Sequence, residues 1–327
     1  MNIIDIAKLA GVSKSTVSRF LNDGYVSEES RKKIQKIIDE TGFIPSNHAK
    51  TLRTKKTNLI GVILPKISSE TIGKIVNGIS KEISKSGYDI ILGNTDLNID
   101  KEIEYLNIFK NKNVDGVIFV ATIITKRHLD VLKEMQIPVV IVGQKIDDYS
   151  CVYHSDYESA YDMTKYLIEK NHKKIAYIGV TVKDKSAGLN RQKGYEACLK
   201  DKMIEYNPDL IKIGEFTQES GYKLSKELLD KYKDIDAIFC STANIALGAI
   251  KYMKEANIDI PKDISICAIG DSKVLNIVTP NLTSIHYYYE ESGVESAKIL
   301  VNMLNGNKDI SDIKLGYEII IRDSVKN

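Results

Sequence analysis

Hydrogen-bonding side chains recur at helical spacing between residues 14 and 22, while Val17, Phe20 and Leu21 occupy the opposite side of the same helix. At about 100° per residue, the polar side chains fall within one arc of about 140°: Lys14, Ser15, Ser18, Arg19 and Asn22. Arg and Lys donate hydrogen bonds to guanine edges, and hydroxyl groups donate to phosphate oxygens. The pattern therefore allows the reading of DNA bases, although a solvated surface helix has the same pattern.

Two further short helices are predicted around this one. Apolar residues at positions 3, 6, 7 and 10 form one side of a helix that Gly11 ends. Ser13 is placed to cap the second helix after a short bend. The third helix begins at Ser27, carries acidic residues in its first turn and stops at Gly42. This tight spacing is typical of a helix-turn-helix module, with predicted apolar contacts at Ala10, Val17, Leu21, Ile34, Ile37 and Ile38.

The charge of the chain is unevenly distributed. Residues 1–57 hold 11 Lys and Arg against 6 Asp and Glu, a net charge of +5, whereas the whole chain has a net charge of only +2. The remainder is therefore slightly acidic. A basic segment on an acidic body indicates that the segment meets a polyanion and that the body does not. A solvated basic tail is the alternative.

The pattern of polar and apolar residues changes twice along the sequence, and we predict three parts: residues 1–45, 46–58 and 59–327. After Pro45 the stretch SNHAKTLRTKKT is polar and basic, so it is interpreted as a linker that would be a weak helix when alone. From residue 59, apolar runs such as NLIGVILP, VDGVIFVA and KKIAYIGV alternate with amphipathic stretches. This alternation is typical of parallel sheets covered by helices on both faces, and the number of runs favours two subdomains. The predicted fold class is α/β.

Several function classes are disfavoured by what the 327 residues lack. No apolar run has the length of a membrane span, and the first residues, MNIIDIAKLAG, do not have the pattern of a secretory signal, so we expect a cytoplasmic protein. The chain has neither GxGxxG after a strand nor GxxxxGK(S/T), and no catalytic group can be assigned. We therefore expect no enzyme activity, no metal and no cofactor. Buried reduced thiols, rather than zinc ligands or disulfides, are expected at Cys151, Cys198, Cys240 and Cys267.

These motifs resemble the LacI-type family of bacterial transcription repressors. The likeness is densest at the amino end, where IDIAKLAGVSKSTVSRFLN is followed by VSEESRKKIQKIIDETGFIPSNHAKTLRTKKTNLIGVILP. It continues in the family's order and spacing through NVDGVIF, GLNRQKGY and VTPNLTSI. The resemblance implies an amino-terminal helix-turn-helix DNA-binding domain, a hinge helix and an effector-binding core.

By this resemblance, the second helix is a recognition helix for the major groove of DNA. A good bidentate contact from Lys or Arg to guanine discriminates between bases by about 1–3 kcal/mol. The family's base-reading positions fall here on Lys14, Ser15 and Arg19, and its phosphate-contacting positions fall on Ser13, Thr16 and Asn22.

The linker at residues 46–58 matches the family's hinge helix, which forms on the operator. Leu52, between Lys50 and Arg53, matches the leucine that enters the minor groove at the central step of the operator. An apolar wedge of this kind unstacks and kinks the duplex, and contacts in the bent DNA offset the cost. Packing of Leu52 against the core is the alternative.

The body resembles periplasmic sugar-binding proteins. The resemblance implies two doubly wound parallel-sheet subdomains, with a ligand between them at the carboxyl ends of the strands. We place the first subdomain at about residues 59–157 and 287–318, and the second at about residues 158–286 and 319–327.

Six effector-contacting positions follow from the same resemblance. Arg191 is the firmest match, because a fixed fork of donors can bind sugar hydroxyls or a phosphate equally well. Phe216 would offer an apolar platform, or else serve as an ordinary core residue. The six positions are Lys66, Lys185, Arg191, Phe216, Asn244 and Asp271.

The chain also departs from the pattern of many family members. His154-Ser155 stands where they have Asp-Asn, Asn244 stands where they have Asp, and the GDSKV loop is one residue shorter. These changes count against purine and simple pentose effectors. The stretches VTVKDKSAGLNR and IALGAIKYM are more similar to trehalose and sucrose operon repressors. If the chain resembles the trehalose operon repressors, Lys66 would neutralise the phosphate group of a disaccharide phosphate. The alternative is that Lys66 is an ordinary surface lysine.

The resemblance thus implies a sequence-specific transcriptional regulator that represses a sugar-utilisation operon. A homodimer would present two recognition helices to a pseudo-palindromic double-stranded operator. A sugar or sugar phosphate would favour one subdomain arrangement and so change operator affinity. Two alternatives stay open: a catabolite-control-type regulator with a phosphorylated carrier protein as corepressor, and a sugar-acting enzyme on a doubly wound fold.

Overall fold

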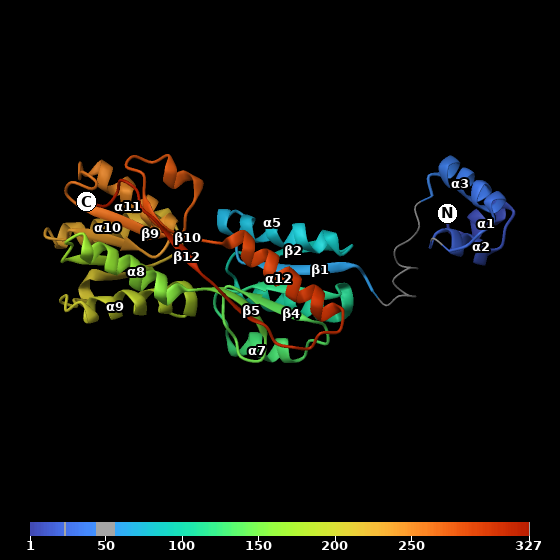
Figure 1. Cartoon of the computed structure of the whole chain (residues 1–327), viewed down its shortest axis with the longest axis horizontal. Coiled ribbons are helices and arrows are strands. Elements are labelled where there is room, and N and C mark those ends of the chain that lie inside the picture. Colours follow the sequence, from blue (N-terminus) through green and yellow to red (C-terminus); the bar gives the residue numbers. More distant parts are fainter. Residues whose placement is uncertain (23, 44–55, 327) are drawn as a thin grey trace. The chain divides into compact units, whose positions relative to one another are not determined.

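Residues 1–22, 24–43 and 56–326 are described by the computed structural model. Their internal contacts divide the chain into two units, Met1–Thr57 and Asn58–Asn327 (Figure 1). Each unit is built around its own buried apolar side chains, in one cluster for the first unit and four for the second.

Three helices make up the first unit: α1 Ile3–Ala10, α2 Lys14–Phe20 and α3 Glu28–Thr41. The ends of α1 and α3 and the starts after Ser13 and Ser27 agree with the prediction, whereas α2 ends at Phe20, before the last residue of the predicted helical pattern, Asn22. The Ser13 and Ser27 hydroxyls each accept a hydrogen bond from the backbone amide three residues later, which satisfies a donor that the helix itself leaves unpaired. Gly11 and Gly42 end α1 and α3 with φ of 64° and 61°, a left-handed conformation that glycine adopts without strain.

The core of this unit lies where the three helices meet. Its buried side chains include Val17 from α2, and the half-buried side chains of Phe20 and Leu21 pack against them. The predicted apolar sides of all three helices are therefore confirmed. The buried residues are Ile6, Ala7, Ala10, Val17, Ile34 and Phe43.

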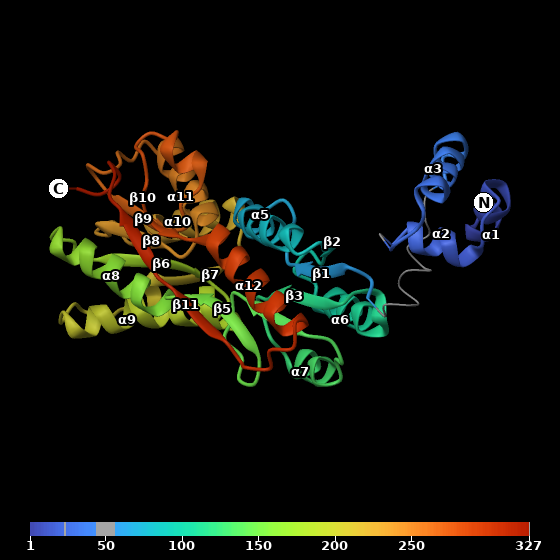
Figure 2. The same ribbon diagram turned by 45° about the vertical axis from the view of Figure 1, so that its right-hand side comes forward.

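The second unit contains two six-stranded sheets covered by helices on both faces (Figures 1 and 2). The first sheet is parallel throughout, in the order β11-β5-β4-β3-β1-β2. Its strands are β1 Leu59–Leu64, β2 Asp89–Asn94, β3 Gly116–Val120, β4 Val139–Val142, β5 Ser150–His154 and β11 Asp312–Leu315. Helices α5 Glu70–Lys85 and α12 Tyr289–Leu304 cover one face, and α6 Ile99–Ile108 and α7 Lys126–Lys133 cover the other.

The second sheet has the order β12-β10-β9-β8-β6-β7, with β12 antiparallel to β10 and the rest parallel. Its strands are β6 Ile175–Val180, β7 Ile211–Gly214, β8 Ala237–Cys240, β9 Ser265–Ile269, β10 Thr283–Tyr287 and β12 Tyr317–Ile320. Helices α8 Asp156–Glu169 and α9 Arg191–Asp201 pack on one face, and α10 Gln218–Lys231 and α11 Ala243–Glu255 on the other. Short helical turns precede or follow these elements at η1 Phe109–Asn113, η2 Lys185–Asn190, η3 Pro208–Leu210 and η4 Lys273–Asn276.

The chain passes between the two sheets three times. It crosses after β5, after β10 and at Gly316, which separates β11 in the first sheet from β12 in the second. The last crossing therefore precedes the predicted boundary after residue 318, because Tyr317 already pairs with Tyr287 of β10. The ends of β5 and β10 come together where the first two crossings begin.

The four cysteines are buried and free. Burial raises the pKa of Cys151 and Cys198 to about 11, so these thiols stay protonated and unreactive near neutral pH. Among the described residues, no cluster of three His, Cys, Asp or Glu is placed to hold a metal ion. In that same part of the chain, every helix is too short or too polar to cross a membrane.

Candidate functional site

The start of α2 carries a cluster of three hydroxyl groups. Ser13 Oγ lies 2.7 Å from Ser15 Oγ and 2.8 Å from Thr16 Oγ1, and it accepts a hydrogen bond from the Thr16 amide at 3.1 Å. The amino end of a helix carries partial positive charge and amides that favour anions. This end of α2 therefore presents hydrogen-bonding groups of the kind that hold a phosphate.

The outward face of α2 holds the predicted base-reading residues. Lys14, Ser15 and Arg19 are exposed, whereas Val17 on the opposite face is fully buried. The Arg31 guanidinium lies 5.3 Å from the centre of the Phe20 ring and so supports the inner side of the helix from α3. The structure thus brings these three side chains onto one surface.

The end of α2 is closed by hydrogen bonds to its own backbone. The Arg19 carbonyl accepts from the Asn22 amide at 3.2 Å and from the Gly24 amide at 2.8 Å, and Asn22 Nδ2 donates to the Ser18 carbonyl at 2.5 Å. Asn22 is exposed beside Arg19 on the same face. The remaining DNA-contact predictions, Lys50, Leu52 and Arg53, lie outside the described residues.

The six predicted effector residues follow the carboxyl ends of strands, but the structure does not join them in one set of contacts. Lys66 follows β1 and is exposed, and Lys185 is exposed at the start of η2. Phe216 is half-buried after β7, where its carbonyl accepts a hydrogen bond from Asn244 Nδ2 at 3.4 Å. This hydrogen bond joins two of the six predicted residues directly.

Arg191 is buried at the start of α9, and its Nε and Nη1 each donate a hydrogen bond within the protein. Its Nε donates to Asp156 Oδ1 and its Nη1 donates to the Ser241 carbonyl, each at 2.6 Å. Tyr287 completes the group, because its hydroxyl donates to the same Asp156 oxygen at 3.2 Å and its ring lies 5.4 Å from the guanidinium. Burial by itself lowers the pKa of Arg191, but the Asp156 carboxylate and the neighbouring tyrosines raise it, so the charge persists.

His154 ends β5 beside this group. Its ring stacks on Tyr287 with centroids 4.6 Å apart and meets the edge of Tyr289 at 5.1 Å. Burial lowers the pKa of His154 to about 4, and the Asp156 carboxylate only partly opposes this, so the imidazole is neutral. We call His154, Asp156, Arg191, Ser241 and Tyr287 the junction cluster, because it includes the last residues of β5 in one sheet and β10 in the other, where two of the three crossings begin.

Close helix packing positions the ion pair at the centre of the junction cluster. Asp156 opens α8 and Arg191 opens α9, and the two helices lie side by side (Figure 2). They approach closely at Gly194, where a Cβ would stand 2.2 Å from the Tyr157 carbonyl oxygen. A larger residue at Gly194 would force the helices apart and separate the carboxylate from the guanidinium.

Asp271 is engaged by a different arginine. Its Oδ1 accepts from Arg322 Nη2 at 2.7 Å and from Ser284 Oγ at 3.1 Å, and its Oδ2 lies 3.4 Å from His286 Nδ1. The Asp271 backbone carbonyl accepts from Lys74 Nζ of α5 at 3.2 Å. The side chain is thus held within its own subdomain, while its backbone contacts the other.

A second contact between the subdomains lies near η2. Gln144, which follows β4, donates from Nε2 to Asp184 Oδ1 at 2.9 Å, and Ser186 Oγ donates to the Gly143 carbonyl at 2.6 Å. Burial raises the pKa of Asp184, while hydrogen bonds from Gln144 and the Ala187 amide oppose the rise. Polar contacts therefore bridge the two subdomains both at η2 and at α5.

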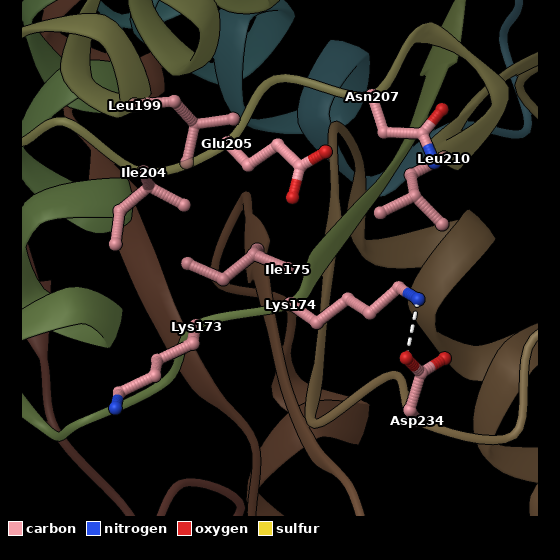
Figure 3. A pocket seen from close by; sticks show the side chains of 9 residues that line it. All are labelled: Lys173, Lys174, Ile175, Leu199, Ile204, Glu205, Asn207, Leu210 and Asp234. Atoms are coloured by element: carbon pink, nitrogen blue, oxygen red, sulfur yellow. Dashed lines mark hydrogen bonds and ion pairs between the residues drawn. The ribbon is translucent and has the colours of Figure 1, made fainter.

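A cavity of about 300 Å³ lies at the amino-terminal end of β6 in the second sheet (Figure 3). Lys173 and Lys174 line it just before β6 begins, and Lys174 Nζ donates to Asp234 at 2.5 Å across it. The predicted effector residues of this sheet follow the carboxyl ends of its strands, whereas this cavity lies at an amino end. The cavity is therefore separate from the predicted effector site.

Three members of the junction cluster, Asp156, Ser241 and Tyr287, were missed by reasoning from sequence. Asp156 is 35 residues from Arg191 and 131 residues from Tyr287, so no local spacing connects them. An acidic residue in the first turn also stabilises a helix through the partial positive charge of its amino end, so Asp156 needs no partner to explain its position. The only signal was the neighbouring His154-Ser155 pair, which departs from the family pattern.

Comparison with known proteins identifies the family. Residues 2–46 match the model of bacterial regulatory proteins of the lacI family, and residues 164–325 match a periplasmic binding protein-like domain. Over 321 residues the chain is 37% identical to the sucrose operon repressor of Staphylococcus xylosus, covering 97% of this chain and 99% of that one. The protein belongs to the lacI family. It is accordingly a DNA-binding transcriptional regulator, and the predicted fold class is confirmed.

Other relatives of this lacI-family protein span its full length. Catabolite control protein A of Priestia megaterium is 31% identical over 330 residues, covering 100% of this chain and 99% of that one. Among solved structures, a complex of the regulator CelR with cellobiose has 26% identity and a TM-score of 0.77, covering 99% of each chain. The lac repressor dimer bound to operator has a TM-score of 0.90 at 20% identity, covering 100% of this chain and 99% of that one, and this likeness concerns the fold alone.

Proposed function

We propose that this protein is a cytoplasmic, homodimeric repressor of a sugar-utilisation operon, without enzyme activity. A sugar or sugar phosphate that binds between the two subdomains changes its operator affinity. The observation that carries the DNA arm is the exposed polar face of α2 above a fully buried Val17. The identity to a sucrose operon repressor and the likeness to a CelR–cellobiose complex support the sugar arm.

In this proposal Lys14, Ser15 and Arg19 contact bases, and Ser13, Thr16 and Asn22 contact phosphates. Two copies related by a two-fold axis present their α2 helices to the two halves of a pseudo-palindromic operator. The hinge proposal adds Leu52 as the minor-groove wedge, with Lys50 and Arg53 beside it, and these three residues lie outside the described part of the chain.

The effector arm rests on subdomain contacts that can differ between two arrangements. Hydrogen bonds cross between the subdomains at Gln144–Asp184 and at Lys74–Asp271. An effector that binds one arrangement better shifts the population toward it, and the same coupling energy links sugar affinity to DNA affinity. The proposed contacts are Lys66, Lys185, Arg191, Phe216, Asn244 and Asp271, with Lys66 as the partner of a phosphate where the sugar carries one.

The test is a selection of random double-stranded DNA with the full-length protein. We expect a two-fold symmetric site to be enriched, and fluorescence anisotropy to show a shift in its Kd on adding sucrose, trehalose or cellobiose, or one of their 6-phosphates. Enrichment of no symmetric site contradicts the DNA arm. A Kd that none of these compounds changes contradicts the sugar arm.

A second candidate function is supported by the 31% identity to catabolite control protein A over the whole chain. Under it, a phosphorylated carrier protein acts as corepressor and raises operator affinity. Adding that carrier, phosphorylated or not, to the same anisotropy assay separates the two candidates. A phosphorylation-dependent gain in operator affinity favours the corepressor, and an unchanged Kd favours the sugar effector.

A further inference from the structure

The junction cluster contains a polar atom without a hydrogen-bond partner among the described residues. His154 Nε2 is buried and has no such partner. Buried polar atoms in native proteins are nearly always paired, because an unpaired one loses its water without compensation. Such an atom close to the buried Arg191–Asp156 pair indicates a site that a hydrogen-bonding ligand completes.

The neighbours of His154 decide which kind of hydrogen bond its Nε2 offers. Burial is the main cause of the lowered pKa of His154, whereas a backbone hydrogen bond from the ring to Tyr288 raises that pKa, as a carbonyl acceptor does. Because Nε2 is the unpartnered nitrogen, the ring proton resides on Nδ1 and the Nε2 lone pair is available. Nε2 is therefore an acceptor that calls for a donor from a ligand.

Resting on the function proposed above, we infer that His154 is a specificity-determining residue whose Nε2 accepts a hydrogen bond from a hydroxyl group of the sugar effector. A hydroxyl is a donor, whereas a phosphate dianion offers only lone pairs to Nε2. The charge of Arg191, close to the same ring, is already balanced by Asp156 at 2.6 Å. The sugar therefore presents an unphosphorylated hydroxyl at the junction cluster, and any phosphate lies elsewhere.

His154→Phe is the direct test, because phenylalanine keeps a ring against Tyr287 and Tyr289 and removes the acceptor. The full-length protein is titrated with sucrose, trehalose, cellobiose and the three corresponding 6-phosphates by isothermal calorimetry and thermal shift. For each compound that binds the wild type, we expect His154→Phe to weaken binding at least tenfold. His154→Gln, whose amide oxygen can accept in place of Nε2, restores part of the affinity.

His128→Phe is the matched control. His128 is also buried and stacked on an aromatic ring, 5.7 Å from Phe119, but its Nε2 pairs with Glu102 at 2.9 Å. We expect this control to lower the melting temperature, since it leaves a buried carboxylate unpaired, and to leave sugar affinity unchanged. For His154→Phe we expect a loss of sugar affinity and a smaller fall in melting temperature than in the control, because Nε2 has no protein partner to lose and only the ring's hydrogen bond to the Tyr288 backbone is removed.

Equal sugar affinity in the wild type and His154→Phe overturns the inference. A wild type that none of the six compounds stabilises also overturns it for sugars of this class. Operator binding measured in the same preparation decides the proposed regulator function separately, because loss of sugar recognition leaves the α2 surface intact.

Discussion

The exposed face of α2 and the junction cluster are built in opposite ways. On α2, Lys14 and Arg19 stand in solvent on a helix whose other side is fixed by Val17, so their hydrogen-bonding groups face outward. In the junction cluster, Arg191 is buried, and its Nε and Nη1 donate to Asp156 and to the Ser241 carbonyl. One surface can be occupied by a large rigid polyanion without rearrangement, whereas the other is completed only by a small ligand that enters among paired groups.

This difference predicts how each region responds to mutation. Removal of an exposed charge on α2 affects binding but not folding, because exposed charges contribute little to stability. Removal of a junction charge leaves its partner buried and unpaired, which costs stability before binding is considered. The two regions therefore separate function from stability to different degrees.

The largest effect is expected for Asp156→Asn. It keeps the size of the side chain but leaves the buried Arg191 charge without its partner and weakens the bond to Tyr287. Breaking one side of a buried ion pair costs about 3–5 kcal/mol. Urea unfolding followed by circular dichroism should show a loss of this size in the free energy of unfolding of the full-length protein.

The double variant Asp156→Asn with Arg191→Met is the control for this prediction. Removing both charges avoids the unpaired guanidinium, so its loss should be well below the sum of the two single losses. A double loss equal to that sum would show that the two side chains do not act as a pair.

The next effect is a pH dependence from His154. Its pKa is lowered from 6.5 to about 4 by burial, so the unfolded chain takes up the proton at higher pH than the folded one. The stability present above pH 6.5 is therefore lost as the pH falls toward 4, about 3 kcal/mol in all at about 1.4 kcal/mol per unit. Parallel unfolding experiments on the wild type and His154→Phe should diverge over this range, and identical pH profiles would contradict the neutral buried imidazole.

The same comparison explains how much was predictable from sequence. Val17, Phe20 and Leu21 face the core because helical periodicity is local, and the caps at Ser13 and Ser27 follow from residue type within one turn. The alternation of apolar runs likewise predicts two wound subdomains. The Asp156–Arg191 pair is not predictable in this way, because its residues meet only through the packing of α8 on α9. The contact with Asp156 also occupies the Nε donor of Arg191, so that donor is not available to the predicted effector.

Arg19→Ala should leave stability unchanged and weaken operator binding. Arg19 is exposed, and one bidentate contact to guanine contributes about 1–3 kcal/mol of discrimination between bases. Anisotropy with the selected operator should show a loss of roughly 5- to 150-fold in affinity at constant salt. Lys36→Ala on α3 is the control, because Lys36 is also exposed in the basic unit but lies near Glu40 at 3.7 Å. An equal loss in both variants would show that Arg19 contributes through nonspecific electrostatic attraction to DNA and not through a base contact.

The smallest effect is expected for Ser13→Ala, which tests whether α2 is held by its cap. The hydroxyl accepts the Thr16 amide at 3.1 Å and lies close to the Ser15 and Thr16 hydroxyls, so the variant leaves a helix amide unpaired. Loss of a cap of this kind costs about 1 kcal/mol of local stability. Amide hydrogen exchange in α2 should therefore accelerate about fivefold, whereas Ser15→Ala, which removes no backbone contact, should not change it. If exchange stays slow in Ser13→Ala, the packing of Val17 alone holds the recognition surface in place, and the role of Ser13 is confined to contact with DNA.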